Sequence, residues 1–161
     1  MIGLPLTILL TIFISLFFFF QRKSFTFTEN SIVFMIITIL TTNVITILNL
    51  NLQMIKTTEN PFLFPAVLLY RNIIIPLLVL SLINVSHAWS TLKGKFFYFI
   101  FIFACINGIE TLLIFMDVFK LIKWNSFNSA IINVAYLFIG LGSSKIVLLV
   151  SRRSLKNDSG L

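Results

Sequence analysis

One acidic residue, Glu110, lies inside a long apolar stretch and is the clearest candidate for chemistry in this sequence. The stretch, residues 96–116, is long enough to span the hydrocarbon core of a bilayer. An ionised side chain at that depth costs about 2.5–3.5 kcal/mol on insertion scales. We therefore expect Glu110 to be surrounded by a partner cation, hydrogen-bond donors, water or a bound proton.

Polar residues near Glu110 suggest what its surroundings are. Asn107 and Asp117 lie three residues before it and seven after it, which places all three on one helical stripe. Arg71 lies near the outer end of the preceding apolar run, where it could meet Glu110 and let both remain charged. We expect either an architectural ion pair or a pathway for an ion or proton. A neutral Glu110 and a contact with another subunit are the remaining alternatives.

The sequence lacks the residue sets that metal sites and enzymes need. Its single cysteine, Cys105, excludes an intramolecular disulfide, and its single histidine, His87, is expected to pack rather than to bind a ligand. No H-E-x-x-H, G-x-S-x-G or P-loop pattern is present. The other four acidic residues are expected at span ends, in loops or in the tail: Glu29, Glu59, Asp117 and Asp158. We predict no catalysis, no metal site and no cofactor.

The composition predicts a membrane protein. The chain of 161 residues is 58% hydrophobic and 11% charged, whereas soluble domains are about 45–50% apolar and about 25% charged. The net charge of +7 does not indicate nucleic-acid binding, because the basic residues fall at the ends of apolar runs rather than on a continuous surface. We predict an all-α transmembrane helical bundle in a single domain, residues 1–150, in contact with the lipid bilayer. The abundance of Phe, Ile, Asn and Lys is typical of a low-GC bacterium.

Five apolar runs are expected to cross the bilayer. They cover residues 2–20, 31–52, 72–90, 96–116 and 127–150. Residues 62–90 are expected to form either one strongly tilted helix or a broken one. Pro61, Pro65 and Pro76 favour a break, which would leave residues 62–70 as a separate interfacial or re-entrant piece. Residues 151–161 are expected to form a short basic cytoplasmic tail. Four spans remain possible if one of the first two runs does not cross.

The basic residues indicate how the spans are oriented. Seven lie in segments expected to be cytoplasmic, and three lie in segments expected outside. The seven are Arg22, Lys23, Lys93, Lys95, Arg152, Arg153 and Lys156, and the three are Lys56, Lys120 and Lys123. By the positive-inside rule, this bias predicts a multi-pass protein of the cell membrane with its N-terminus outside and its C-terminus in the cytoplasm.

Two spans carry a face of polar or small residues. These are Thr38, Thr42, Thr46 and Asn49 on the second span, and Asn133, Tyr136, Gly140 and Ser144 on the fifth. Polar groups would gain nothing from lipid, so both faces are expected to look inward or toward a partner. Gly140 and Ser144 form a small-x-x-x-small pair, which permits close approach of another helix.

These features favour a non-enzymatic membrane subunit that binds other integral membrane proteins or further copies of itself. A small transporter or channel that uses a polar site at Arg71 and Glu110 is the alternative. No inverted repeat supports that alternative, and five spans cannot divide into equal halves. A receptor is disfavoured, because the loops and tail are too short to form a signalling domain.

Overall fold

The all-α fold is confirmed by a computed structural model, which describes residues 2–158 and the side chains as far as Arg153. Five helices in this part of the chain are long and apolar enough to cross a membrane. The helices are α1 (Gly3–Phe20), α2 (Phe27–Thr46), α3 (Phe64–Leu69), α4 (Ile75–Ala88), α5 (Leu92–Phe115) and α6 (Ser126–Asp158). The remaining elements are the π-helical turns η1 (Ile47–Asn51) and η2 (Tyr70–Ile74) and the short strands β1 (Ile55–Thr57) and β2 (Phe119–Leu121).

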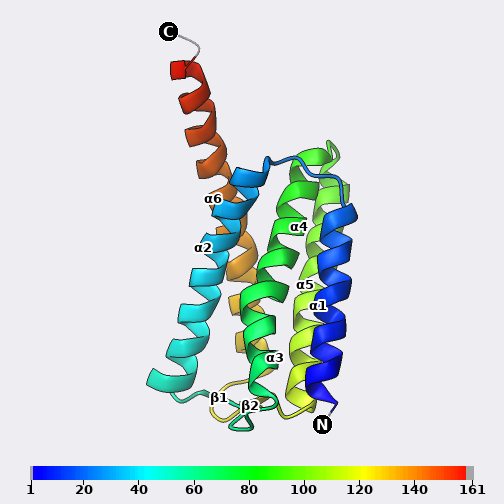
Figure 1. Cartoon of the computed structure of the whole chain (residues 1–161), viewed down its shortest axis with the longest axis vertical. Coiled ribbons are helices and arrows are strands. Elements are labelled where there is room, and N and C mark those ends of the chain that lie inside the picture. Colours follow the sequence, from blue (N-terminus) through cyan, green and yellow to red (C-terminus); the bar gives the residue numbers. More distant parts are fainter. Residues whose placement is uncertain (1, 159–161) are drawn as a thin grey trace.

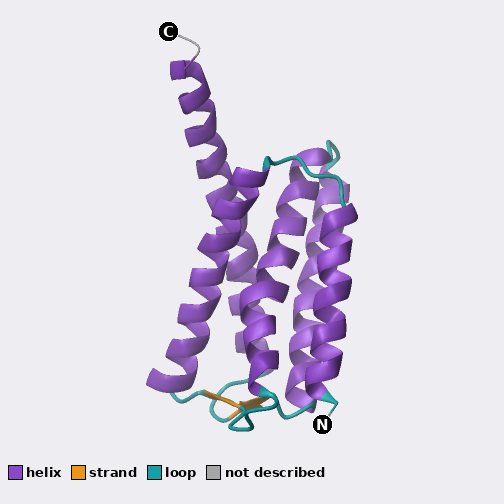
Figure 2. Ribbon diagram, viewed as in Figure 1, coloured by secondary structure: helices purple, strands orange, loops and turns teal. Residues whose placement is uncertain are grey.

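Successive long helices run in opposite directions along the bundle, so the two termini lie at opposite ends (Figure 1). The N-terminus lies at the end where β1 and β2 pair, which we call the ribbon end (Figure 2). The loops formed by residues 21–26 and 89–91 lie at the other end, on the side of the C-terminus, which we call the basic end.

The third span differs from the sequence-based expectation. Residues 62–70 do not form a separate piece, because a single helical segment runs from Phe64 to Ala88 through α3, η2 and α4. Pro65 lies in the first turn of α3 and Pro76 in the first turn of α4. The N–H that proline lacks costs few helical hydrogen bonds at these positions. The π-helical turn η2 ends at Ile74, two residues before Pro76, where it accommodates the proline ring that would disrupt a regular helix.

Two other boundaries also differ. The helix α2 begins at Phe27 rather than at residue 31, because Thr26 and Glu29 form a capping box. In it the Glu29 N–H donates to Thr26 Oγ1 at 3.3 Å, and the Thr26 N–H donates to Glu29 Oε2 at 2.9 Å. The first part of the expected tail, residues 151–158, continues α6 as helix, since this stretch contains no Gly or Pro.

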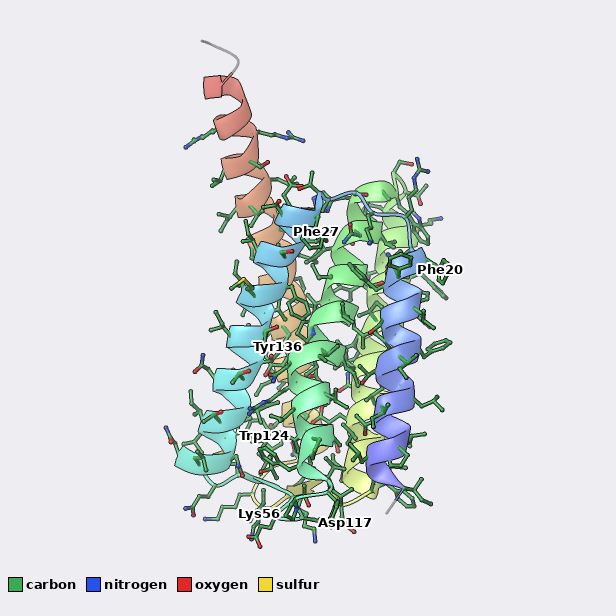
Figure 3. The ribbon with its side chains drawn as sticks, in the orientation of Figure 1. Phe20, Phe27, Lys56, Asp117, Trp124 and Tyr136 are labelled. Carbon is green, nitrogen blue, oxygen red and sulfur yellow. The ribbon has the colours of Figure 1, made fainter. Side chains whose placement is uncertain are left out.

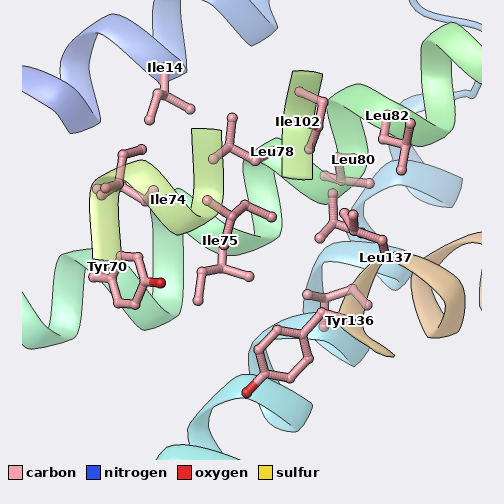
Figure 4. Close-up of a cluster of buried hydrophobic side chains, with 14 of the residues drawn as sticks. Ile14, Tyr70, Ile74, Ile75, Leu78, Leu80, Leu82, Ile102, Tyr136 and Leu137 are labelled. Carbon is pink, nitrogen blue, oxygen red and sulfur yellow. The ribbon is translucent and has the colours of Figure 1, made fainter. Parts of the chain in front are cut away.

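The segment from Phe64 to Ala88 is the centre of the bundle. In its most apolar 18-residue stretch, 67% of the residues are buried, whereas the corresponding share in the other four spans is 17–28%. It contacts α1, α2, α5 and α6, and its apolar side chains, among them Ile75 and Leu82, fill the core (Figure 4). The outer helices turn large apolar side chains such as Phe20 and Phe138 away from the core. A single central helix surrounded by four apolar ones is an arrangement that suits lipid rather than water.

Hydrogen bonds at the basic end attach the loop between α1 and α2 to α4. The fully buried Asn84 accepts from the backbone N–H of Ser24 at 2.9 Å and donates to Asn30 Oδ1 at 2.8 Å. One turn earlier, the Ser81 hydroxyl bonds Gln21 Oε1 at 2.6 Å. These bonds satisfy loop groups that would otherwise be buried without partners.

We predict that Asn84→Ala destabilises the fold by about 1–3 kcal/mol for each backbone or amide group that it leaves unpaired. Thermal unfolding of the purified protein in mild detergent measures the effect. The matched control is Asn43→Ala, because Asn43 is exposed and bonds only the Ile39 carbonyl of its own helix. Equal melting temperatures for the two variants would contradict this role of Asn84.

Candidate functional site

Two paired strands close the ribbon end. The lysine on each strand forms an ion pair with an acidic residue three positions away in the sequence. β1 and β2 pair antiparallel, which places Lys56 opposite Lys120. Like charges in this position repel, and each lysine has an acidic neighbour: Lys56 contacts Glu59 at 2.7 Å and Lys120 contacts Asp117 at 3.4 Å. The contact with Lys56 also holds the pKa of the Glu59 carboxyl below its usual value.

Asp117 belongs to this ribbon and not to the stripe expected around Glu110. The helix α5 ends at Phe115, and Asp117 has a positive φ of 59°. The Asp117 N–H donates to the Ile114 carbonyl at 3.1 Å, and the Val118 N–H donates to the Leu113 carbonyl at 2.9 Å. This is the Schellman arrangement that ends a helix. Asp117 is therefore exposed at the ribbon end (Figure 3).

Glu110 and Asn107 meet Asn133, which α6 presents from across the bundle. Asn133 Nδ2 donates to Glu110 Oε2 at 2.8 Å and to Asn107 Oδ1 at 3.2 Å. Asn107 and Glu110 lie one turn apart on α5 and are half-buried, whereas Asn133 is buried. A single amide therefore joins the two polar residues of α5 to α6.

A small cavity of about 40 Å³ lies beside Glu110. Its polar lining comes from η2, α5, α6 and the loop between β2 and α6: Tyr70, Glu110, Trp124, Ser129, Asn133 and Tyr136. Ile55 of β1 and Phe119 of β2 contribute apolar lining, which places the cavity under the ribbon. A water molecule needs roughly 10–15 Å³ of such space, so the cavity has room for about three waters. The Glu110 carboxylate thus borders a small space with polar walls.

The expected pairing of Arg71 with Glu110 is wrong. The ion pairs among the described side chains are Lys56–Glu59 and Lys120–Asp117. On η2, Tyr70 lines the cavity, and successive residues of a helix do not share a face, so Arg71 points elsewhere. Its carbonyl accepts a hydrogen bond from Thr41 Oγ1 at 2.8 Å, and its Nε is buried without a hydrogen-bond partner in the described part of the chain.

The polar face expected on the second span lies at the edge of its buried side. All four of its residues are half-buried: Thr38, Thr42, Thr46 and Asn49. Thr42 Oγ1 donates to Asn72 Oδ1 at 3.0 Å, and Asn49 Nδ2 donates to Thr57 Oγ1 at 3.1 Å. The fully buried polar residue of α2 is Thr41, which the sequence-based reading left out. Two residues of this face thus bond other parts of the same chain, whereas the Thr38 hydroxyl is buried without a partner in the described part of the chain.

The face expected on the fifth span is buried along its whole length. Its residues are Asn133, Tyr136, Gly140 and Ser144. A Cβ atom at Gly140 would overlap Val79 of α4 and would come within 3.5 Å of Ile37 of α2. The close approach that Gly140 permits is therefore between helices of this chain.

We predict that Gly140→Leu destabilises the bundle by about 1–3 kcal/mol or more, because α4 blocks the space that the new side chain needs. Gly142→Leu is the matched control, since a Cβ at the exposed Gly142 meets nothing within 4 Å. Thermal unfolding and size-exclusion chromatography in detergent compare the two. A stable Gly140→Leu variant with an unstable Gly142→Leu variant would show that the packed face is the opposite one.

Comparisons of the chain with protein-family models, with curated proteins and with solved structures find no match.

Proposed function

We propose that this chain is a non-enzymatic multi-pass protein of the cell membrane that binds another integral membrane protein, either a different subunit or a second copy of itself. Five helices of spanning length and apolar composition support the membrane location. The need for a partner is inferred from Arg71, which this fold leaves without a counter-charge.

Arg71 is a permanent cation inside a membrane-spanning segment. It lies seven residues into the segment that begins at Phe64, about 10 Å along the helix axis. It forms no ion pair with any described side chain, and its Nε is buried without a partner. A charged residue at the centre of a span costs about 2.5–3.5 kcal/mol on insertion scales, and such residues are usually paired.

A carboxylate on a helix of another protein would supply what Arg71 lacks. A guanidinium binds a carboxylate through two parallel hydrogen bonds, which gives such a contact both strength and a defined geometry. The backbone at Arg71 is held in place by the hydrogen bond from Thr41. A partner therefore meets an arginine whose main chain is already ordered, which lowers the entropy lost on binding.

A small transporter is the second candidate, and the cavity beside Glu110 is the observation that favours it. The sequence-based form of this idea required Arg71 and Glu110 to form one site. Since they do not pair, a transport role would depend on Glu110 alone. Arg71 remains available for a partner in either case.

We predict that Arg71→Leu reduces recovery of the partner about tenfold or more when the tagged protein is purified in mild detergent. The loss of a buried charge pair costs 2–5 kcal/mol, and tenfold corresponds to about 1.4 kcal/mol. The measurement is quantitative mass spectrometry of membrane proteins that co-purify in fixed ratio.

Two variants make this test specific. Lys145→Leu removes an exposed cation from α6 and is expected to leave the partner bound. Arg71→Glu is expected to lose the partner and to regain it when the partner's carboxylate is replaced by arginine. Recovery that is unchanged in Arg71→Leu, or a wild-type protein that purifies as a monomer, would contradict the proposal.

The proposed orientation places the ribbon end outside and the basic end in the cytoplasm. Lys56, Lys120 and Lys123 belong to the ribbon and its flanking loop, whereas the seven other counted basic residues lie in the loops and helix ends of the opposite side. This unequal distribution supports the orientation under the positive-inside rule.

We predict that a membrane-impermeant maleimide labels Glu59→Cys but not Lys93→Cys in intact cells, since the two residues lie at opposite ends of the bundle. Both variants are made in a Cys105→Ser background to remove the native thiol. Labelling of both variants after permeabilisation is the control. The reverse pattern in intact cells would invert the orientation.

A further inference from the structure

We propose that Glu110, Asn133 and the cavity beside them form a binding site for a small, hard monovalent cation, for which Na⁺ and the proton are the two sources. This inference does not depend on the proposed function, because it involves neither Arg71 nor a partner protein.

The first argument is that the carboxyl group of Glu110 has no cationic partner in the described part of the chain. It lies five residues from the end of α5, about 8 Å from the ribbon end of that helix. Its hydrogen-bond partners are the Asn133 amide and the Tyr70 hydroxyl, which are both neutral, and the described ion pairs of the chain do not include it. Neutral donors offset the lost hydration of an ionised carboxylate inside a bilayer less than a counter-cation does.

The second argument is that the site offers oxygen atoms. Asn133 uses both N–H groups of its amide, one toward Glu110 and one toward Asn107, so its remaining polar atom is an acceptor. Tyr70 and Tyr136 add hydroxyl oxygens to the same cavity. Carboxylate, carbonyl and hydroxyl oxygens together are the ligands that hard cations prefer.

The third argument is space and access. The cavity of about 40 Å³ accommodates a small cation with one or two waters, and it is too small for an organic ligand. It lies beneath β1 and β2, at the ribbon end of the bundle. Glu110 is therefore separated from that end only by the ribbon and the side chains that line the cavity.

The groups that face Glu110 do not already neutralise it. The titratable groups facing it are Tyr70 on η2 and Tyr136 on α6, and both are neutral donors or acceptors at ordinary pH. On the side of β2, Lys120 and Asp117 are exposed and pair with each other. A bound cation is thus the species that balances the carboxylate.

The test uses the full-length protein in lipid nanodiscs and compares wild type with Glu110→Gln. Glutamine keeps an oxygen that accepts the hydrogen bond from Asn133, so this variant is expected to fold. Thermal unfolding is measured in two series: NaCl replacing choline chloride at fixed pH, and a pH series in choline chloride. Glu59→Gln is the control, because Glu59 is an exposed carboxylate at the same end.

A ligand that binds only the folded state raises its stability. We expect wild type and Glu59→Gln to be stabilised by Na⁺ or by lower pH, and Glu110→Gln to lose that response. A response to Na⁺ identifies Na⁺ as the cation, whereas a response to pH alone identifies the proton. In the second case dicyclohexylcarbodiimide, which reacts with protonated carboxyls, modifies Glu110. Equal responses of wild type and Glu110→Gln in both series would overturn the proposal.

Discussion

A bilayer supplies no water to polar groups, and this constraint accounts for most of what holds the bundle together. Each polar side chain within a span must find a partner on another helix, on its own backbone or at the surface. The central segment from Phe64 to Ala88 provides most of the partners that lie on another element, through Asn72, Ser81 and Asn84 and through the carbonyl of Arg71. The four outer helices can then be largely apolar on their outward sides, because many of their polar groups bond this segment or one another.

The two ends of the bundle differ in how their buried polar groups are satisfied. At the basic end, the loop after α1 is fixed to α4 by hydrogen bonds from buried amides and hydroxyls, and little polar capacity is left over. At the ribbon end, two short strands and a tryptophan cover a cavity with polar walls beside Glu110. A closed end gives rigidity, whereas an end with unused acceptors can receive a ligand. This difference between the ends fits the proposal that the polar residues at the basic end are structural and that those beside Glu110 bind a cation.

The lengths of the apolar runs were enough to predict an all-α fold with five helices long enough to span a membrane. Side-chain direction was harder, because it depends on where each helix begins and ends. The Thr26–Glu29 capping box was a readable signal for the start of α2. The end of α5 before Asp117 depends on tertiary packing of Val118, which sequence spacing does not reveal. Likewise, Tyr70 lines the cavity and Arg71 does not, because the rotation of η2 within the bundle directs Tyr70 toward it.

The separation of Arg71 from Glu110 has a consequence for how charge is organised in this protein. Both residues lie in spans at a similar distance from the ribbon end, about 10 Å and about 8 Å along their helices. Had they paired, each would have neutralised the other, and neither would need a second molecule to do so. Because they do not pair, the two proposals assign them ligands of opposite charge, a partner carboxylate for Arg71 and a cation for Glu110. A ligand that binds only the folded chain would stabilise it in each case.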